Sequence, residues 1–264
     1  MTDTSYSLAE LVIVACAEIW RGNGEVMATG ISPLPRIGVG LARLTFAPEI
    51  QTTDGETWYT SEPIGPGPRV REPEIEGIAH HDRIFFSLWS GLRHALTAPV
   101  QIDRFGQTNL SVIGDHQKPK TAMLGARGLP GNSANHPNSF FFPNHSKRAF
   151  VEGEVDFVCT AGYNPARYID GRPPRYLELR FIITNLCVMD FGGPDRQIRV
   201  ISLHPGVTFE EVQDNSGFPL AKIADVIPVT PAPTAEQLAI IAQLDPHNVR
   251  ATIFKGNPVI SGRL

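Results

Sequence analysis

Residues 7–53, SLAELVIVACAEIWRGNGEVMATGISPLPRIGVGLARLTFAPEIQTT, decide the fold class, because helical and extended patterns alternate there over short connections. Apolar side chains recur at helical spacing after Ser7, and Glu10, three residues on, completes a capping box. The glycines of residues 22–24 end this predicted helix. The chain therefore opens on a helix that begins next to Ser7.

The rest of this stretch predicts a strand, a turn, a second helix and a second strand. These elements cover residues 26–29, 30–35, 37–46 and 50–53. Helices that alternate with strands over short loops are typical of a parallel α/β sheet, in which functional loops gather at the carboxyl ends of the strands. We therefore predict an open, Rossmann-like, mainly parallel sheet flanked by helices, with the turn after Gly30 and the corner at Asp54 on its functional edge.

The remaining sequence is interpreted as part of the same domain, which we expect to cover residues 1–264. Residues 60–76 are rich in Pro and Gly and predict a loop that borders a cleft. Further short elements are predicted as a helix at 83–92 and strands at 99–103, 108–112, 175–185 and 198–203. A C-terminal linker and a last amphipathic helix are expected within residues 228–250.

The composition is that of an ordinary globular chain, with 42% hydrophobic residues, 19% charged residues and a formal net charge of −4. No basic block favours nucleic acid or an anionic membrane, and no apolar run is long enough to span a bilayer. The N-terminus has none of the features expected of a signal peptide. Three scattered cysteines indicate buried thiols in a reducing compartment, which predicts a cytoplasmic protein, and no Cys or His spacing suits a metal site.

Residues 125–132, GARGLPGN, are the most unusual stretch of the chain. Three glycines and a proline in eight residues predict a loop of fixed backbone shape rather than the interior of a helix or strand. The loop carries one guanidinium, on Arg127, and one carboxamide, on Asn132. Two interpretations stay open from these residues alone: a binding loop, or a plain surface turn that contains an arginine.

The carboxylates of Asp54 and Glu56 follow the second predicted strand and form another candidate site. A carboxylate at a strand end, partly shielded from water, can act as a nucleophile or a base. Asp54-Gly55 is also the residue pair expected in a simple turn. Several other chemistries are excluded, because the sequence contains no GxSxG elbow, no P-loop and no complete dinucleotide-binding GxGxxG motif.

Several stretches together resemble the β subunits of family I coenzyme A transferases. The resemblance rests on residues 30–35 (GISPLP), 101–109 (QIDRFGQTN), 203–208 (LHPGVT), 216–218 (SGF) and 244–246 (LDP) with Arg250. Two departures from the family pattern narrow the resemblance to one subgroup. Asp54 stands where that family carries its catalytic Glu, and residues 125–132 replace a Gly-Gly-Ala-Met-Asp segment.

These departures, with residues 144–148 (NHSKR), 184–186 (TNL) and 190–195 (DFGGPD), look most like the IpdB subunits of the IpdAB steroid-ring coenzyme A hydrolases. The resemblance implies the sheet fold shared by NagB, RpiA and coenzyme A transferases, an α subunit that supplies the essential Glu, and an α2β2 heterotetramer. It also implies a hydrolase that opens a ring of a steroid-derived coenzyme A thioester in cholesterol catabolism. Coenzyme A would then be part of the substrate, and no other cofactor and no metal is expected.

The expected site residues follow from this resemblance. Arg127 would grip a substrate carboxylate or carbonyl through its forked guanidinium, with Gly128, Asn132 and Asn135 binding substrate or water. Asp54 is a further catalytic candidate.

The aromatic run at Phe140 and Phe141 is expected to pack against the alicyclic ring of the substrate, unless it belongs to the core. Two alternative functions also stay open. One is a true transferase β subunit with Asp54 or Glu56 as nucleophile, and the other is a structural or ligand-sensing subunit without chemistry.

Overall fold

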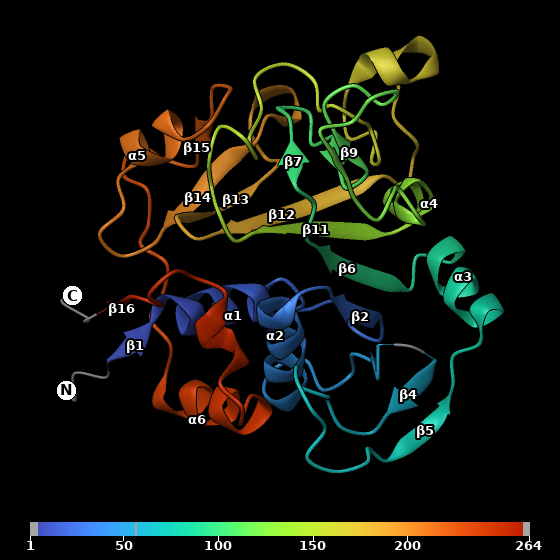
Figure 1. The fold of residues 1–264 in the computed structure, drawn as a ribbon, viewed down its shortest axis with the longest axis vertical. Helices are drawn as coiled ribbons and strands as arrows, with labels where there is room; N and C mark the ends of the chain where they lie inside the picture. The colour runs from blue at the N-terminus through green and yellow to red at the C-terminus, as the bar shows by residue number, and fades with distance from the viewer. Residues whose placement is uncertain (1–4, 56, 261–264) are drawn as a thin grey trace. The chain divides into compact units, whose positions relative to one another are not determined.

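The computed structural model describes residues 5–55 and 57–260. Its contacts gather in two compact units (Figure 1). Unit 1 consists of Met1–Thr97 and Pro231–Leu264, and unit 2 of Ala98–Thr230. The expectation of a single domain over residues 1–264 stays a prediction, and each unit is described by itself.

Unit 1 is built on two long helices that lie against each other beside a parallel strand pair (Figure 1). Its main elements are α1 (Leu8–Glu18), β2 (Met27–Gly30), α2 (Pro33–Leu44), β6 (Arg93–Thr97) and α6 (Ala235–Leu244). The capping box at Ser7 and Glu10 is confirmed, with the Glu10 N–H donating to Ser7 Oγ. Gly38 lets the helices approach closely, because a Cβ there would lie 2.8 Å from Cys16 Cβ.

Two predictions for unit 1 are corrected. α2 begins at Pro33 rather than at residue 37, because a proline needs no N–H partner in the first turn of a helix. The strand predicted at residues 50–53 shrinks to β3 (Thr52–Thr53). It pairs antiparallel with β4 (Trp58–Thr60), which pairs with β5 (Ile75–Ile78), although Gln51 still bridges Met27 in parallel.

The remaining elements of unit 1 close its ends. They are α3 (His81–Trp89), the 3-10 helix η4 (Val249–Thr252), and the antiparallel pair of β1 (Tyr6–Ser7) with β16 (Val259–Ile260). The buried Asp245 accepts hydrogen bonds from the backbone N–H groups of Val249 and Arg250, at 2.8 and 2.9 Å. Arg250 also reaches Glu10 in α1, at 3.2 Å. The LDP motif with Arg250 therefore ties the C-terminal segment to the first helix.

Unit 2 contains a five-stranded sheet in the order β15-β14-β13-β12-β11. These strands are β11 (Pro137–Phe142), β12 (Glu178–Thr184), β13 (Cys187–Asp190), β14 (Arg199–Leu203) and β15 (Ala221–Lys222). β11 and β12 are parallel, as are β14 and β15, whereas β13 runs antiparallel to both of its neighbours. With the parallel β2–β6 pair of unit 1, the predicted α/β fold with a mainly parallel sheet flanked by helices is confirmed.

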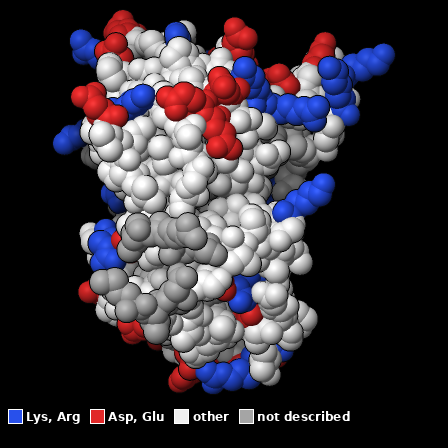
Figure 2. Space-filling model, turned by 90° about the vertical axis from the view of Figure 1, so that its left-hand side faces the viewer, with Lys and Arg blue, Asp and Glu red and all other residues white. Residues whose placement is uncertain are grey.

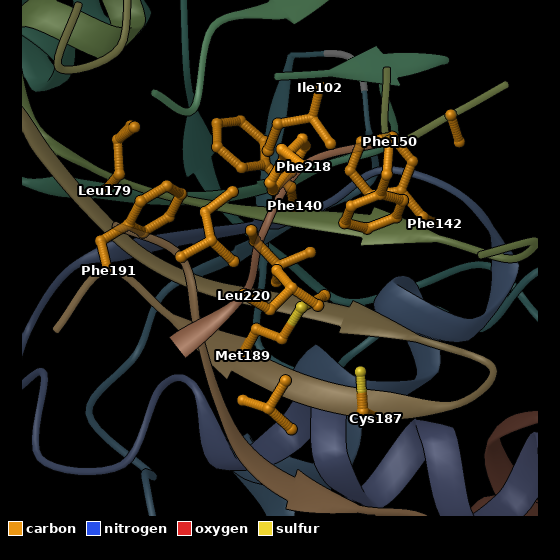
Figure 3. Packing of buried hydrophobic residues seen from close by; sticks show 14 of the residues in the cluster. Ile102, Phe140, Phe142, Phe150, Leu179, Cys187, Met189, Phe191, Phe218 and Leu220 are labelled. Atoms are coloured by element: carbon orange, nitrogen blue, oxygen red, sulfur yellow. The ribbon is translucent and has the colours of Figure 1, made fainter. Parts of the chain in front are cut away.

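Short elements complete unit 2. They are β7 (Gln101–Ile102), β8 (Thr108–Asn109), β9 (Val112–Ile113), β10 (Thr121–Ala122), α4 (Leu129–Asn135), α5 (Phe209–Asp214) and the 3-10 helices η1 (Pro165–Arg167), η2 (Ile169–Gly171) and η3 (Pro194–Arg196). Aromatic rings fill the core against the sheet, where Phe142 and Phe218 both lie beside Phe150 (Figure 3).

The surface carries both signs of charge. On the face drawn in Figure 2, acidic and basic side chains lie interspersed. Within the described residues, no helix is long and apolar enough to cross a membrane.

Candidate active site

The loop that carries Arg127 is only partly a loop. The chain turns with positive φ at Gly125 (86°) and Arg127 (50°), and α4 begins two residues later at Leu129. The prediction that no helix could form in residues 125–132 is therefore wrong for its second half. Pro130 is tolerated there because it lies in the first turn, where its missing N–H has no partner in any helix.

Arg127 is presented to solvent from a strained backbone. A left-handed conformation costs a non-glycine residue about 1–2 kcal/mol, and side chains that hold it tend to cluster at functional sites. Among the described residues, none forms a hydrogen bond or an ion pair with its exposed guanidinium. The side chain is therefore available to an anionic or carbonyl ligand.

Asn132 lies in the first turn of α4. The Asn132 backbone N–H donates to Gly128 O at 2.9 Å, which links the two predicted binding residues within one turn. The Asn132 side chain is buried, and its Oδ1 has no hydrogen-bond partner in the described structure. A buried acceptor without a partner is destabilising by about 1–3 kcal/mol, so a ligand hydroxyl or a water at this atom would be favourable.

The side chain of Asn135 makes a hydrogen bond within the helix. Its Nδ2 donates to Gly131 O at 2.9 Å, which satisfies a carbonyl of α4. The structure therefore brings Arg127, Gly128 and Asn132 together at the start of α4 and gives Asn135 a helix-stabilising contact.

Phe140 and Phe141 lie in the core. Their exposed fractions are 1% and 0%, and the ring of Phe140 meets Phe191 edge-on at 6.5 Å (Figure 3). Both sit in β11, whose two faces are covered, so neither ring presents a surface to a ligand. Their expected contact with substrate is corrected to packing.

The corner at Asp54 belongs to unit 1 and is a capped turn. Asp54 Oδ1 accepts the backbone N–H groups of Thr57 and Trp58, both at 3.1 Å, and its Oδ2 lies 3.6 Å from Arg69 Nη2. The carboxylate is 7% exposed. The Asp54 carboxylate therefore stabilises the turn, which is the role that the Asp54-Gly55 sequence indicated. Glu56, the other nucleophile considered, lies outside the described residues.

A small cavity of about 60 Å³ opens beside this corner. Gly30, Arg36 and Thr53 are among its lining residues, and its volume suits a few water molecules. Arg36 donates to Ile64 O at 2.8 Å and to Asp54 O at 3.0 Å. Burial lowers the pKa of this guanidinium, while the nearby Asp54 carboxylate acts in the opposite direction. Arg36 was not predicted, and its place in the first turn after the Gly30 turn was the only signal.

Four of the motifs that carry the resemblance meet in one buried network in unit 2. His145 stacks on Phe150 with ring centroids 3.8 Å apart, and its Nε2 lies 2.9 Å from Ser216 Oγ. Its Nδ1 faces Thr184 Oγ1, and His204 Nε2 lies 2.9 Å from Thr184 O. Burial lowers the pKa of His145 to about 3 and that of His204 to about 4. These histidines are neutral structural groups that join segments far apart in the sequence.

The QIDRFGQTN motif also forms a buried turn. Asp103 Oδ1 accepts the backbone N–H groups of Phe105 and Gln107, at 2.9 and 3.2 Å, much as Asp54 caps its own corner. Burial raises the pKa of Asp103 to about 7, although these hydrogen bonds oppose the shift. Its role is therefore to shape unit 2.

Nucleophilic thiols and metal clusters do not stand out in the described residues. All three cysteines are free and buried, and burial raises the pKa of Cys187 to about 12 and also those of Cys16 and Cys159. Within residues 5–55 and 57–260, no group of three His, Cys, Asp or Glu side chains could hold a metal ion. The arrangement therefore offers an exposed guanidinium and a buried carboxamide, but no activated nucleophile in the described part of the chain.

Comparison with known proteins places the chain among named relatives. No family model matches it. It is 42% identical over 252 residues to the cholesterol ring-cleaving hydrolase IpdB subunit of Rhodococcus jostii RHA1. This alignment covers 94% of this chain and 96% of the relative. It is 32% identical over 262 residues to the B subunit of the 3-oxoadipate CoA-transferase of Pseudomonas knackmussii, over 94% and 96% of the two chains. Among solved structures, the crystal structure of Rhodococcus jostii RHA1 IpdAB matches with a TM-score of 0.87 and 40% identity, covering 96% of this chain and all of the matched one.

Proposed function

The chain belongs to the family of the cholesterol ring-cleaving hydrolase IpdB subunits, and from that premise we propose that it is the β subunit of a heteromeric hydrolase that opens a ring of a steroid-derived cyclic coenzyme A thioester. The observation that carries the proposal is the state of the Asp54 carboxylate. Where a transferase needs a free Glu to attack a thioester, this chain has a shorter side chain whose Oδ1 is held by two backbone N–H groups. The chain is therefore suited to chemistry that uses no nucleophile of its own.

The proposed reaction is hydrolysis of a ring C–C bond next to a ketone. A base removes a proton from water, and the water oxygen bonds to the ketone carbon. The ring C–C bond then breaks, and its electron pair passes to the neighbouring carbon, where the second carbonyl of a β-diketone-like ring holds it as an enolate. Protonation of that carbon leaves a new carboxylate at the former ketone. Such a reaction needs a base for the water and donors for the developing negative charge, and it needs no metal.

The proposal divides these roles between two chains. We assign the base to a Glu of the α subunit, within an α2β2 assembly, because no free base stands out among the described residues of this chain. Arg127 is the donor: its guanidinium is exposed, always charged and shaped for a bidentate contact with a carboxylate or an enolate. Asn132 Oδ1, buried without a partner in the described structure, would accept a hydrogen bond from a substrate hydroxyl or a water.

The proposal also includes the compartment and the cofactors. Three free, buried thiols fit a reducing compartment, and we expect the enzyme to work in the cytoplasm. Coenzyme A enters as part of the substrate, and the reaction as written requires no other cofactor.

The second candidate is a coenzyme A transferase β subunit, and the similarity to the 3-oxoadipate CoA-transferase chain favours keeping it. The two functions differ in their need for an acyl acceptor. The chain co-purified with its α partner should open a ring-containing coenzyme A thioester without any acceptor acid. Turnover that requires an acceptor, together with borohydride trapping of a thioester on this chain, would establish the transferase instead. Failure to turn over any thioester would leave a structural or sensing subunit.

Arg127 provides the matched test of the site. We expect Arg127→Ala in the complex to lower turnover by about 100- to 1,000-fold, the usual loss for one donor to a developing oxyanion. Arg127→Lys should recover only part of this, because an ammonium cannot make the forked contact. Arg172→Ala, which removes another exposed arginine, is the control and should leave turnover unchanged. Wild-type turnover by Arg127→Ala would contradict the assignment.

A further inference from the structure

Two half-buried arginines of unit 1, Arg36 and Arg93, form no ion pair with any described carboxylate. Arg36 donates to two backbone carbonyls, at 2.8 and 3.0 Å. Arg93 Nε donates to Thr29 Oγ1 at 3.1 Å. Within the described structure, Arg36 Nη1 and both terminal nitrogens of Arg93 have no hydrogen-bond partner. A guanidinium that is partly removed from water and unpaired is destabilising, so an anion beside it would be favourable.

Both arginines border the small cavity beside the Asp54 corner. Arg36 is one of its lining residues, and a Cβ added at Gly55, another lining residue, would lie 3.5 Å from Arg36 Nη1. Thr29, which accepts the hydrogen bond from Arg93 Nε, also lines the cavity. The cavity is therefore bordered by Arg36 directly and by Arg93 through Thr29, and we call it the Arg36–Arg93 cavity.

The nearest carboxylate cannot serve both arginines. Burial lowers the pKa of Arg36 and that of Arg93. The Asp54 carboxylate opposes this effect at Arg36, but its Oδ2 also lies 3.6 Å from Arg69 Nη2. At Arg93 the opposing group is the phenol of Tyr59, and phenols carry no charge at neutral pH. Asp54 is therefore shared by two arginines, and Arg93 is left without a countercharge among the described residues.

The volume of the Arg36–Arg93 cavity limits what can enter it. The cavity measures about 60 Å³, whereas pockets for drug-sized ligands measure about 300–1,000 Å³. One water molecule needs about 10–15 Å³ by the same measure. The cavity therefore has room for a small ion and a water molecule, but not for a ring or a coenzyme A chain. Guanidinium nitrogens only donate hydrogen bonds, so the ion that fits them is an anion.

We propose that the Arg36–Arg93 cavity holds one small monovalent anion, of the size of chloride or formate, as a resident counter-ion. The anion accepts hydrogen bonds from Arg36 Nη1 and from the terminal nitrogens of Arg93. Because Arg36 also donates to Ile64 O and Asp54 O, an anion that fixes its guanidinium stabilises the Asp54 corner. The anion is not a reactant, and the inference does not depend on the proposed function.

Thermal melting of the full chain tests the site in solution. Sodium chloride and sodium formate are compared with sodium gluconate at equal ionic strength, because gluconate is too large for the cavity. For the wild type we expect a melting temperature that rises and saturates with chloride or formate. The rise should be about 3 °C at ten times the dissociation constant, relative to gluconate.

Two variants locate this effect. Arg93→Gln keeps a donor for Thr29 but removes the charge, so it should lose the response to chloride and formate. In gluconate it should melt no lower than the wild type, because it lacks the uncompensated charge. Arg71→Gln is the control, since Arg71 is exposed and pairs with Glu62 in the same unit, and it should respond as the wild type does.

Anomalous diffraction from crystals soaked in sodium bromide gives a second, independent readout, because bromide replaces chloride and its position can be seen directly. We expect a bromide ion in contact with Arg36 and Arg93 in the wild type and none there in Arg93→Gln. Water alone in the cavity of the soaked wild-type crystals would overturn the inference.

Two solution results would also overturn it. If Arg93→Gln responds to chloride and formate as strongly as the wild type, the anion binds elsewhere. If a coenzyme A thioester at saturation abolishes the response of the wild type, the cavity receives a group of the substrate rather than a resident ion. Ring opening is assayed separately, so each of these results leaves the proposed function standing.

Discussion

Replacing His145 with Gln should change how the stability of the protein depends on pH. The imidazole is buried, lies parallel to the ring of Phe150 at 3.8 Å, and meets Ser216 Oγ at 2.9 Å. Burial lowers its pKa to about 3 in the folded chain. In the unfolded chain the pKa of a histidine is about 6.5.

The sign of the effect follows from these two values. As the pH falls through about 6.5, the unfolded chain takes up a proton at this residue, and the folded chain takes one up only near pH 3. Acid therefore favours unfolding between these limits, by about 1.4 kcal/mol per pH unit for one proton. Between pH 7.5 and 5 the wild type should lose about 2 kcal/mol of unfolding free energy through His145 alone.

The carboxamide in His145→Gln takes up no such proton, so the variant lacks this loss. At pH 7.5 it should be less stable than wild type by about 2 kcal/mol, because it loses the stacked ring and weakens a buried hydrogen bond. The difference between the two proteins should then shrink to near zero at pH 5. The shrinking difference isolates His145, since every other group titrates in both proteins.

Urea unfolding at pH 7.5, 6.5 and 5.0 measures this difference, and the NMR shift of the imidazole Hε1 follows the protonation directly. The exposed His247 supplies the control: His247→Gln should leave the stability at pH 7.5 unchanged. A difference that stays constant across pH, or an NMR titration of His145 near pH 6.5, would refute the reasoning.

Three further changes test other parts of the structure. Asp54→Asn keeps an oxygen for the two turn N–H groups, so ring opening by the complex should stay within about tenfold of wild type, whereas loss of all activity would restore Asp54 as nucleophile. Asp103→Asn should remove a pH dependence of opposite sign. Because burial raises the pKa of Asp103 to about 7, the stability of the wild type falls as the pH rises from about 4 to 7. In urea unfolding, the variant should therefore gain up to about 4 kcal/mol relative to wild type on going from pH 4 to 8. Gly38→Ala places a Cβ 2.8 Å from Cys16 Cβ and should lower the free energy of unfolding by about 1–3 kcal/mol, seen as a lower melting temperature; an unchanged melt would mean that α1 and α2 separate easily.

The sequence predicted the elements whose signals are local. The capping box before α1 and the alternation of helices with strands each depend on residues a few positions apart, and the structure confirms them. α4 was missed because a seven-residue helix with Pro and Gly has no strong propensity of its own. No local pattern indicated the network around His145, since its parts come from four segments that only tertiary packing brings together.

Only the part of the candidate site that has a local signal could be predicted from the sequence. Arg127 and Asn132 could be singled out because a rare backbone composition surrounds them, and the structure places both at the start of α4. For Phe140 and Phe141 the core stayed one of two open interpretations, because an aromatic run looks alike in a core strand and in a binding pocket, and the structure places both rings in the core. Whether a side chain faces a ligand depends on which strands cover it, which is not a local property.

The motifs shared with the coenzyme A transferases divide into two groups by what their side chains contact. Those around His145, His204 and Asp103 are buried and satisfy backbone groups or each other, so they preserve the fold whatever the reaction. The two segments that depart from the transferases are the Asp54 corner, which has a capped carboxylate, and the Arg127 segment, which has an exposed cation. The buried motifs preserve the fold, whereas the chemistry changes at the Asp54 corner and the Arg127 segment. The two can therefore diverge independently, provided that a second chain supplies the group this one has lost.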